Sequence, residues 1–251
     1  MENIKILKHI YLDKCFLFFL VIIILTGNYN YFIPYFSLLL IHELGHALTG
    51  IILGYKLDKI MFYPLGGVTI FNLPINIPII KELLILVMGP IAQILGYSFL
   101  IKIYPSVSIY HYTLLLFNLL PIYPLDGGKI VNLLLNYKIN YLNSFKIIYY
   151  VSLIMLFFLL IYNFFNFNLN LLLMIIVLFL KLVKDYKNRY YYYNKFLLER
   201  LLNNYRFKKL KYISNDKCFY KDSVHYINYV SEKNYLKNYF NKHIINYEKK
   251  D

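Results

Sequence analysis

The stretch "LLLIHELGHALTGIILG", residues 38–54, places His42, Glu43 and His46 inside a run that is otherwise apolar. A charged or strongly polar side chain near the middle of a membrane span costs about 2.5–3.5 kcal/mol on insertion scales, so this cluster needs an offsetting interaction. Coordination of a metal ion supplies one. The alternative is a polar network between helices, or a re-entrant segment, that holds no metal.

These three residues form the pattern H-E-x-x-H. Side chains four positions apart project from one face of a helix, so His42 and His46 can be adjacent ligands of a tetrahedral zinc ion. Glu43 lies one residue round the helix from the first ligand, where its carboxylate can act as the general base of a hydrolysis. The pattern predicts a zinc hydrolase site with two of its protein ligands.

The composition of the chain indicates a membrane protein. Its 251 residues are 59% hydrophobic and 20% aromatic, and the mean hydropathy is +0.50. These values exceed those of soluble domains, and a membrane span needs roughly 20 predominantly apolar residues. We expect an all-α polytopic membrane protein with about six transmembrane helices, over residues 15–27, 33–54, 79–101, 107–122, 147–164 and 168–183. The first segment lacks a convincing signal-peptide cleavage site, so we interpret it as a helix that is retained.

The net charge of +14 lies mostly outside the apolar segments, and residues 181–251 hold 17 Lys or Arg against 7 Asp or Glu. Basic connections alternate with nearly uncharged ones along the chain, which fits six spans with both termini in the cytoplasm. The charge therefore indicates membrane topology, and we expect no nucleic acid as a partner.

A polar connection follows the second expected span. Residues 57–78, "LDKIMFYPLGGVTIFNLPINIP", contain β-branched and aromatic residues around a turn signal at Gly66-Gly67, and they end with Pro74 and Pro78. This composition favours a short membrane-associated β-hairpin or looped strand between helices 2 and 3. An irregular connection is the alternative.

We expect residues 1–184 to form a six-span domain and residues 185–251 to form a basic, Tyr- and Asn-rich cytoplasmic tail. Residues 186–204 fit an amphipathic helix with an apolar leucine stripe. Three roles are open to the tail: contact with anionic lipid, packing as a small cap, or binding of a partner.

A catalytic zinc site usually has three protein ligands and a water. Residues 47–54 contain no His, Asp or Glu, so the third ligand lies elsewhere in the chain. The acidic residues near the membrane are Asp58, Glu82 and Asp126. Asp58 falls in a polar connection, and Glu82 suits the first turn of a helix, so Asp126 is the strongest candidate.

Asp126 lies in "LFNLLPIYPLDGGKIVNLLL", at the inward end of the fourth expected span. Pro121 and Pro124 prevent a regular helix there, and Gly127-Gly128 lets the backbone turn without steric cost. The carboxylate can therefore point back into the helix bundle. Since His42 lies about midway along the second span, we expect an active site within the membrane, near the cytoplasmic side.

Asn118 precedes Asp126 in the same apolar segment. Its amide is suited to hold the carbonyl under attack or to position the substrate backbone, and the alternative is a hydrogen bond between helices. His111 lies nearer the outer end of the segment and is expected at the membrane interface. The remaining histidines lie in polar flanks and receive no metal role: His9, His225 and His243.

The combination of H-E-L-G-H in one span with N-x-x-P-x-x-P-L-D-G-G in a later one resembles the site-2 protease family of intramembrane zinc metalloproteases, peptidase family M50. The resemblance covers roughly residues 10–183, and it is strongest to the stage IV sporulation protein FB branch. It implies His42, His46 and Asp126 as ligands of one zinc ion per chain, Glu43 as general base and Asn118 as a catalytic or substrate-positioning residue.

The resemblance also implies hydrolysis of a peptide bond in a membrane-embedded or membrane-associated protein, which must unwind locally to be cut. In the sporulation branch the substrate is a membrane-tethered sigma-factor precursor, and small membrane proteins inhibit the protease. A tethered transcription regulator and such inhibitors are therefore the partners that the resemblance implies. That branch usually carries a C-terminal cystathionine-β-synthase-type domain, which residues 185–251 do not match, so a reduced regulatory segment is one interpretation of the tail.

Two alternatives differ in class from this interpretation. One is a different membrane metalloprotease, such as a prenyl-protein endopeptidase or an enzyme with Glu82 as the third zinc ligand. The other is a non-proteolytic membrane metal-binding or transport protein whose polar groups line a path, which predicts no stoichiometric zinc in the purified protein. The content of zinc and the identity of its third ligand separate the three.

Overall fold

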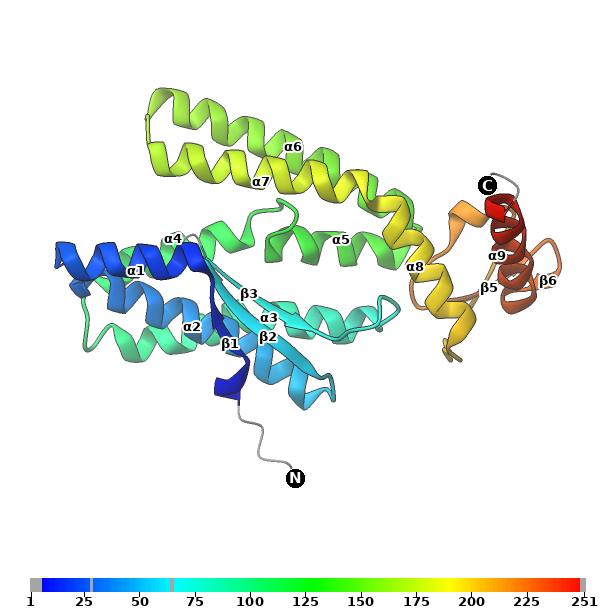
Figure 1. Cartoon of the computed structure of the whole chain (residues 1–251), viewed down its shortest axis with the longest axis horizontal. Helices are drawn as coiled ribbons and strands as arrows, with labels where there is room; N and C mark the ends of the chain where they lie inside the picture. The colour runs from blue at the N-terminus through cyan, green and yellow to red at the C-terminus, as the bar shows by residue number, and fades with distance from the viewer. Residues whose placement is uncertain (1–5, 28, 64–65, 249–251) are drawn as a thin grey trace. The chain divides into compact units, whose positions relative to one another are not determined.

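The computed structural model describes residues 6–27, 29–63 and 66–248. The chain divides into two compact units, whose elements are labelled in Figure 1. The chain crosses between the units at several points, so neither is one continuous segment. The first comprises Met1–Leu73, Ile80–Leu120 and Leu125–Ile130, and the second Pro74–Ile79, Pro121–Pro124 and Val131–Asp251.

The first unit is built mainly from apolar helices. They are α1 (Lys14–Thr26), α2 (Tyr29–Ile52), most of α3 (Ile79–Leu100), α4 (Val107–Leu119) and the start of α5 (Asp126–Lys138). Helix α2 runs through the middle of this unit's core. The core is a cluster of buried side chains from α1, α2, α4 and a small sheet, including Phe16, Leu38, Leu39, Ile60, Phe62 and Leu114.

The sheet has three strands in the order β1 (Ile10–Leu12), β2 (Leu57–Tyr63) and β3 (Gly66–Phe71), preceded by the 3-10 turn η1 (Ile6–His9). β1 is parallel to β2, and β2 is antiparallel to β3. The connection between α2 and α3 thus contains two strands, whereas β1 was not expected. The expected turn at Gly66-Gly67 is wrong, because both glycines belong to β3 and Gly67 lies against the side chain of Glu43. Residues 64–65, between the strands, lie outside the described residues.

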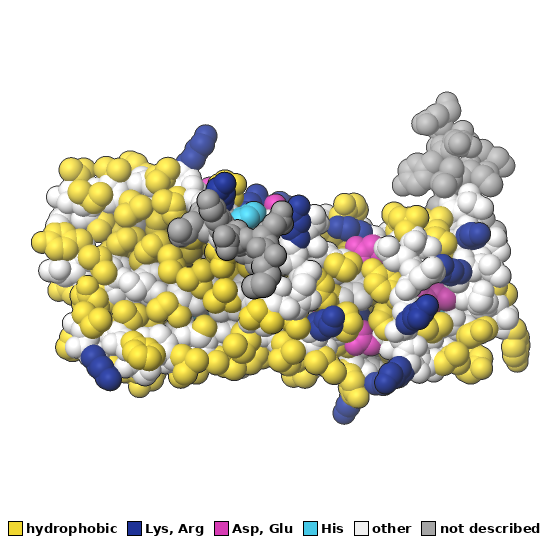
Figure 2. All heavy atoms as spheres, turned by 90° about the horizontal axis from the view of Figure 1, so that it is seen from below, with side chains coloured by type: hydrophobic (Ala, Val, Ile, Leu, Met, Phe, Trp, Pro, Cys, Tyr) yellow, Lys and Arg dark blue, Asp and Glu magenta, His cyan; other side chains and the backbone are white. Residues whose placement is uncertain are grey.

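Among the described residues, three helices are long and apolar enough to cross a membrane by length and composition: α2, α3 and α6 (Tyr141–Phe165). Helices α1 and α4 are apolar but have only 13 residues each, fewer than the roughly 20 that a span needs. The expected number of six spans therefore stays a prediction. Large apolar side chains point outward on these helices, such as Phe99 (70% exposed) and Phe157 (61%). Hydrophobic side chains cover much of the face shown in Figure 2.

The second unit joins a helical hairpin to a small α/β fold. The hairpin is α6 with α7 (Leu169–Lys187), and residue 184, the expected end of the membrane domain, falls inside α7. The α/β fold, called here the C-terminal module (residues 189–248), has one face of buried apolar side chains, including Phe196, Leu197, Phe219 and Leu236. Its elements are α8 (Arg189–Leu202), β4 (Lys209–Ile213), η2 (Asp216–Cys218), β5 (Ser223–Ile227), β6 (Val230–Ser231) and α9 (Glu232–Glu248).

The module is a folded segment with a small sheet, and the three roles considered for the tail stay predictions. β4 and β5 are parallel, and β5 and β6 are antiparallel. The expected amphipathic helix over residues 186–204 corresponds to α8, whose apolar side includes the buried Phe196 and Leu197.

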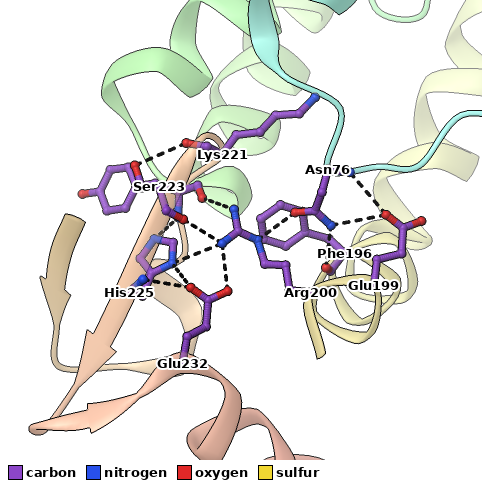
Figure 3. Close-up of polar contacts among 9 residues, drawn as sticks. Asn76, Phe196, Glu199, Arg200, Lys221, Ser223, His225 and Glu232 are labelled. Carbon is purple, nitrogen blue, oxygen red and sulfur yellow. Dashed lines mark hydrogen bonds and ion pairs between the residues drawn. The ribbon is translucent and has the colours of Figure 1, made fainter. Parts of the chain in front are cut away.

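A buried arginine, Arg200 of α8, joins the module to the segment Pro74–Ile79 within the second unit (Figure 3). Its side chain is only 3% exposed. Its Nε–H donates to Asn76 Oδ1 at 2.7 Å, and its Nη1 donates to the carbonyl of Ser223 at 2.8 Å and to Glu232 Oε1 at 2.9 Å. A buried guanidinium is tolerated only when its charge and its donors are matched in this way.

The segment Pro74–Ile79 donates further hydrogen bonds to the module. Glu199 Oε2 accepts from the backbone N–H of Ile75 at 2.7 Å, and the side-chain amide of Asn76 donates to the carbonyl of Phe196 at 2.9 Å. Asp222 Oδ2 accepts from the N–H of Ile79, the first residue of α3, at 2.9 Å. Carboxylate partners at a helix start satisfy donors that the helix itself leaves unpaired. The connection before α3 is therefore held by polar groups rather than left as a free loop.

His225 completes the polar cluster of the module and is neutral in it. Its Nε2 accepts from the N–H of Tyr220 at 3.0 Å, and its Nδ1 lies 3.0 Å from Glu232 Oε2, to which it donates. Burial lowers the pKa of His225 below its ordinary value, as do the positive charges of Arg200 and Lys211, although Glu232 acts in the opposite direction. The placement of His225 in a polar flank on sequence grounds missed this buried role.

We expect the module to lose stability as the pH falls below about 6.5. Because the folded-state pKa of His225 lies below its ordinary value, the unfolded chain binds the proton first, and acid favours unfolding. Hydrogen bonds and charges from His225 and Arg200 outweigh burial and lower the pKa of Glu232, which adds a loss at more acidic pH. Hydrogen exchange of the α8 and β5 amides in the full chain, corrected for intrinsic rates, measures the effect. A His225→Gln protein should lack the loss of stability that begins near pH 6.5 and keep the loss at more acidic pH. A dependence of stability on pH identical to that of the wild type would show that His225 is not the responsible group.

Candidate metal centre

Helix α2 brings His42 and His46 together on one face, where both side chains are buried. They are one turn apart, and their Nε2 atoms lie 3.2 Å from each other. The glycine between them permits close packing of α2 on α3, since a Cβ at Gly45 would lie 2.5 Å from the carbonyl oxygen of Met88. The sequence H-E-L-G-H thus combines two candidate ligands with the small residue that their helix needs at the contact.

The third candidate ligand, Asp126, is the first residue of α5. Its Oδ2 lies 3.1 Å from Nε2 of His42 and 3.1 Å from Nε2 of His46. The turn that places it is very tight, because a Cβ at Gly127 would lie 2.2 Å from the carbonyl oxygen of Leu119, at the end of α4. Only glycine permits this approach. The role expected for Gly127 in the turn therefore has a direct structural counterpart.

The outer nitrogen of each imidazole is held by an oxygen acceptor. His42 Nδ1 lies 3.0 Å from Gln93 Oε1, and His46 Nδ1 lies 2.7 Å from the carbonyl oxygen of Ile85, both on α3. These acceptors select the tautomer with the proton on Nδ1, so each Nε2 presents a lone pair. Together with the Asp126 carboxylate, the two rings direct three lone pairs at one point.

This donor set fits a zinc ion. Ligand atoms around a tetrahedral zinc with bonds near 2.0–2.1 Å lie about 3.3 Å apart, and the three atoms here are separated by 3.1–3.2 Å. Three lone pairs this close repel one another unless a cation lies between them. Of the described residues, His42, His46 and Asp126 form a group that can hold a metal ion. The sequence-based rivals for the third position lie elsewhere, Glu82 in the first turn of α3 and Asp58 in β2.

Glu43 and Asn118 both lie beside this group. Glu43 is 4% exposed, and its Oε2 accepts a hydrogen bond from the hydroxyl of Thr69 on β3. Asn118, in the last turn of α4, has its Nδ2 3.4 Å from His42 Nε2. The structure therefore brings all five residues expected at the site into one neighbourhood of the first unit. Their individual roles remain proposals.

Two residues of α3 contribute to the centre without having been expected there. Gln93 is fully buried and holds His42, and a Cβ at Gly89 would lie 2.3 Å from Nε2 of His46. In the sequence, Gly89-Pro90 interrupts an apolar segment, a feature that usually indicates close helix packing. A lone amide one turn after a Gly-Pro pair in an apolar span was the available signal for Gln93, because an uncompensated amide is unfavourable in lipid.

His111, which was expected at the membrane interface, is buried within the first unit. It is 4% exposed, its ring stacks on Tyr97 with centroids 4.0 Å apart, and its carbonyl accepts from Gln93 Nε2 at 3.1 Å. Gln93 gives the backbone carbonyl of His111 a partner inside the unit. A chain of contacts thus runs from His111 through Gln93 to His42.

Replacing Gln93 by Met should weaken zinc binding by about 10- to 100-fold, the usual cost of removing a residue that orients a metal ligand. Methionine preserves the length of the side chain but offers no strong acceptor for Nδ1 of His42. Equilibrium zinc affinity of the purified protein is the measurement. Ser98→Ala, at an exposed position of the same helix, is the control. Equal affinities in the two variants would show that Gln93 does not orient the ligand.

Comparison with known proteins agrees with this geometry. The family model "Peptidase family M50" matches residues 97–161. Stage IV sporulation protein FB of Bacillus subtilis is 28% identical over 190 residues, which cover 70% of this chain and 66% of that protein. A zinc metalloprotease of Methanocaldococcus jannaschii is 36% identical over 152 residues, which cover 53% of this chain and 44% of that protein. The matched parts are thus less than two thirds of either relative.

The fold of the chain is similar to that of a solved structure. The site-2 protease from Methanocaldococcus jannaschii matches with a TM-score of 0.55 and 27% identity, covering 70% of this chain and 90% of that chain. The resemblance seen in the paired motifs is therefore confirmed, and together with the apolar helices it makes the chain an integral membrane protein. The chain is therefore similar to the site-2 proteases, and its residues 97–161 match peptidase family M50.

Proposed function

We propose that this protein is a zinc-dependent intramembrane endopeptidase that cleaves a membrane-associated protein. One observation carries the proposal: His42, His46 and Asp126 place their ligand atoms within 4.8 Å of one another, in a unit built from apolar helices. Glu43 lies next to the first ligand in the chain and its carboxylate is buried. Similarity to a metalloprotease and to peptidase family M50 supports the same enzyme class.

In this proposal one zinc ion per chain is held by His42, His46 and Asp126. When bound, it supplies a Lewis acid that polarises a carbonyl and lowers the pKa of water. Glu43 takes the proton from the attacking water and delivers it to the amide nitrogen of the leaving segment, so that water is added across the peptide bond. The amide of Asn118 donates a hydrogen bond to the substrate carbonyl oxygen or holds the adjacent backbone.

Strand β3 is suited to present the substrate. It is the last strand of its sheet, paired with β2 along one edge. An extended segment added along the other edge of β3 would expose a peptide bond that an intact helix hides. One face of β3 packs on α2, and Gly67 of β3 lies directly against Glu43. This arrangement links unwinding of the substrate to its delivery beside the general base.

The alternation of basic and uncharged connections supports six spans with both termini in the cytoplasm and a site near the cytoplasmic side of the membrane. The basic C-terminal module would then face the cytoplasm and anionic lipid. The likeness to a sporulation protein supports a role in regulated intramembrane proteolysis, with a sigma-factor precursor or another tethered transcription regulator as substrate and small membrane proteins as inhibitors.

Co-expression with tagged, membrane-tethered transcription regulators tests this function. We expect at least one regulator to be shortened by the wild-type protein and left intact by a Glu43→Gln protein of equal abundance. Purified wild-type protein should contain one zinc ion per chain. Purified protein without zinc would support the non-proteolytic alternative and contradict the proposal.

A further inference from the structure

Strand β3 borders both oxygens of the Glu43 carboxylate, Gly67 next to Oε1 and Thr69 next to Oε2. Residues two apart on a strand project from the same face, and Gly67 and Thr69 both lie against α2 at Glu43. The hydroxyl of Thr69 is 2.6 Å from Glu43 Oε2 and 3.2 Å from the backbone carbonyl oxygen of Glu43. A hydroxyl has one proton, and the shorter contact, to an ionised acceptor, is the stronger one.

Gly67 lies next to Oε1, the second oxygen of the Glu43 carboxylate. A Cβ at this position would lie 2.6 Å from Glu43 Cγ and 2.8 Å from Oε1, distances that are sterically impossible. The absence of a side chain therefore makes room for the carboxylate beneath the strand. Thr69 holds one carboxylate oxygen, while the other remains available to accept a proton.

We propose that Thr69 is a positioning residue for the general base, an inference that rests on the proposed function. A glutamate side chain has three rotatable bonds, and a general base must lie within hydrogen-bond reach of the proton that it removes. A displacement of about 1 Å can cost on the order of 100-fold in rate. The Thr69 hydroxyl ties Oε2 to a strand that is itself paired with β2, so it fixes the direction in which Oε1 points.

The competing interpretation is that Thr69 only joins β3 to α2. Its second contact, to the backbone carbonyl of Glu43, is compatible with that purpose. The two interpretations differ in what they predict. A structural bond affects folding and zinc content, whereas a positioning bond affects the catalytic step and any ligand that hydrogen-bonds to the Glu43 carboxylate.

Thr69→Val removes the hydroxyl with little change in shape, and Thr69→Ser keeps it. With a tethered protein that the wild type cleaves, we expect kcat of Thr69→Val to fall by about 10- to 100-fold, with KM and zinc content changed less than about twofold. Thr69→Ser should restore kcat to within about threefold of the wild type, the small remainder reflecting the added rotational freedom of serine. Thr69→Ala serves in place of Thr69→Val if the valine protein does not fold.

A second measurement does not depend on turnover. Acetohydroxamate chelates zinc through two oxygens, and its N–OH group hydrogen-bonds to a neighbouring carboxylate. Thr69→Val should weaken its binding by about 3- to 10-fold when Glu43 is present and leave it unchanged in a Glu43→Ala background, where the Thr69 hydroxyl has no side-chain partner at position 43, as a double-mutant cycle requires for a coupled pair.

The outcomes distinguish failure of the proposed function from failure of the positioning role of Thr69. If the wild type binds zinc but cleaves no tethered protein, the proposed function fails, while the acetohydroxamate cycle still tests the Thr69–Glu43 coupling. If the wild type cleaves and Thr69→Val has an unchanged kcat, the positioning role is overturned. Loss of zinc from Thr69→Val, or a serine variant as slow as the valine variant, would overturn it as well, since both show a packing role.

Discussion

Glu43→Gln should reduce cleavage by at least about 100-fold while the protein keeps its zinc, because general acid–base groups typically contribute 10²- to 10⁴-fold to a rate. Glutamine has the shape of glutamate and fills the same space beneath Gly67. Its amide oxygen can still accept the hydrogen bond of Thr69. What it lacks is the basicity to remove a proton from water, so the proposal predicts a loss of turnover without a loss of structure.

The measurement is the initial rate of cleavage by purified protein in lipid, with zinc per chain determined on the same sample. Glu82→Gln is the matched control, because Glu82 is a carboxylate of a neighbouring apolar helix that lies in its first turn. It should retain wild-type activity. Undiminished cleavage by Glu43→Gln would falsify the assignment of Glu43 as the general base.

Asp126→Ala should lose both zinc and activity. Removing even an outer partner of a metal ligand costs 10- to 100-fold in affinity, so loss of one of three ligands should exceed about 100-fold. The two imidazoles would remain in place, held by Gln93 and by the carbonyl of Ile85, but two neutral donors are too few for a catalytic zinc site.

Equilibrium dialysis against buffered zinc distinguishes the candidate ligands. Glu82→Ala and Asp58→Ala proteins should bind zinc as tightly as the wild type does. If Asp126→Ala kept its zinc and Glu82→Ala lost it, the site would be that of a different membrane metalloprotease. Asp126 Oδ2 is equidistant from the Nε2 atoms of His42 and His46, so we expect Asp126→Ala to lose zinc and the other two variants to keep it.

The parts of the structure that were predictable are those with local signals. The four-residue spacing of His42 and His46 places them on one helical face in any helix, and the hydropathy of the segment places that helix in lipid. Asp126 was identified from the helix-breaking residues around it. Pro121, Pro124 and Gly127 mark a break between apolar segments, and Asp126 is the one carboxylate at that break. These signals depend on chain chemistry within about 10 residues, and the structure agrees with where they place the side chains.

The parts that were missed depend on partners far along the chain. β1 pairs with β2, which lies far from it in the sequence, and no pattern within either segment indicates this pairing. Gln93 appeared as an isolated amide, and only the packing of α3 on α2 gives it His42 as a partner. His225 was placed in a polar flank and Arg200 drew no attention, because their burial requires β5, α8 and α9 to be assembled first.

The hydrogen bonds around Asn76 have a consequence for the order in which the protein is completed during synthesis. Their partners on α8 and at Asp222 lie 120 to 143 residues further along the chain. A ribosome therefore releases α2, β3 and α3 long before the groups that hold the connection between β3 and α3 exist. Contacts of such large separation form late and slowly. The last hydrogen bonds of this connection can form only after the final quarter of the polypeptide has been synthesised. A nascent chain that already contains all three candidate zinc ligands therefore still lacks the groups that hold the connection before α3.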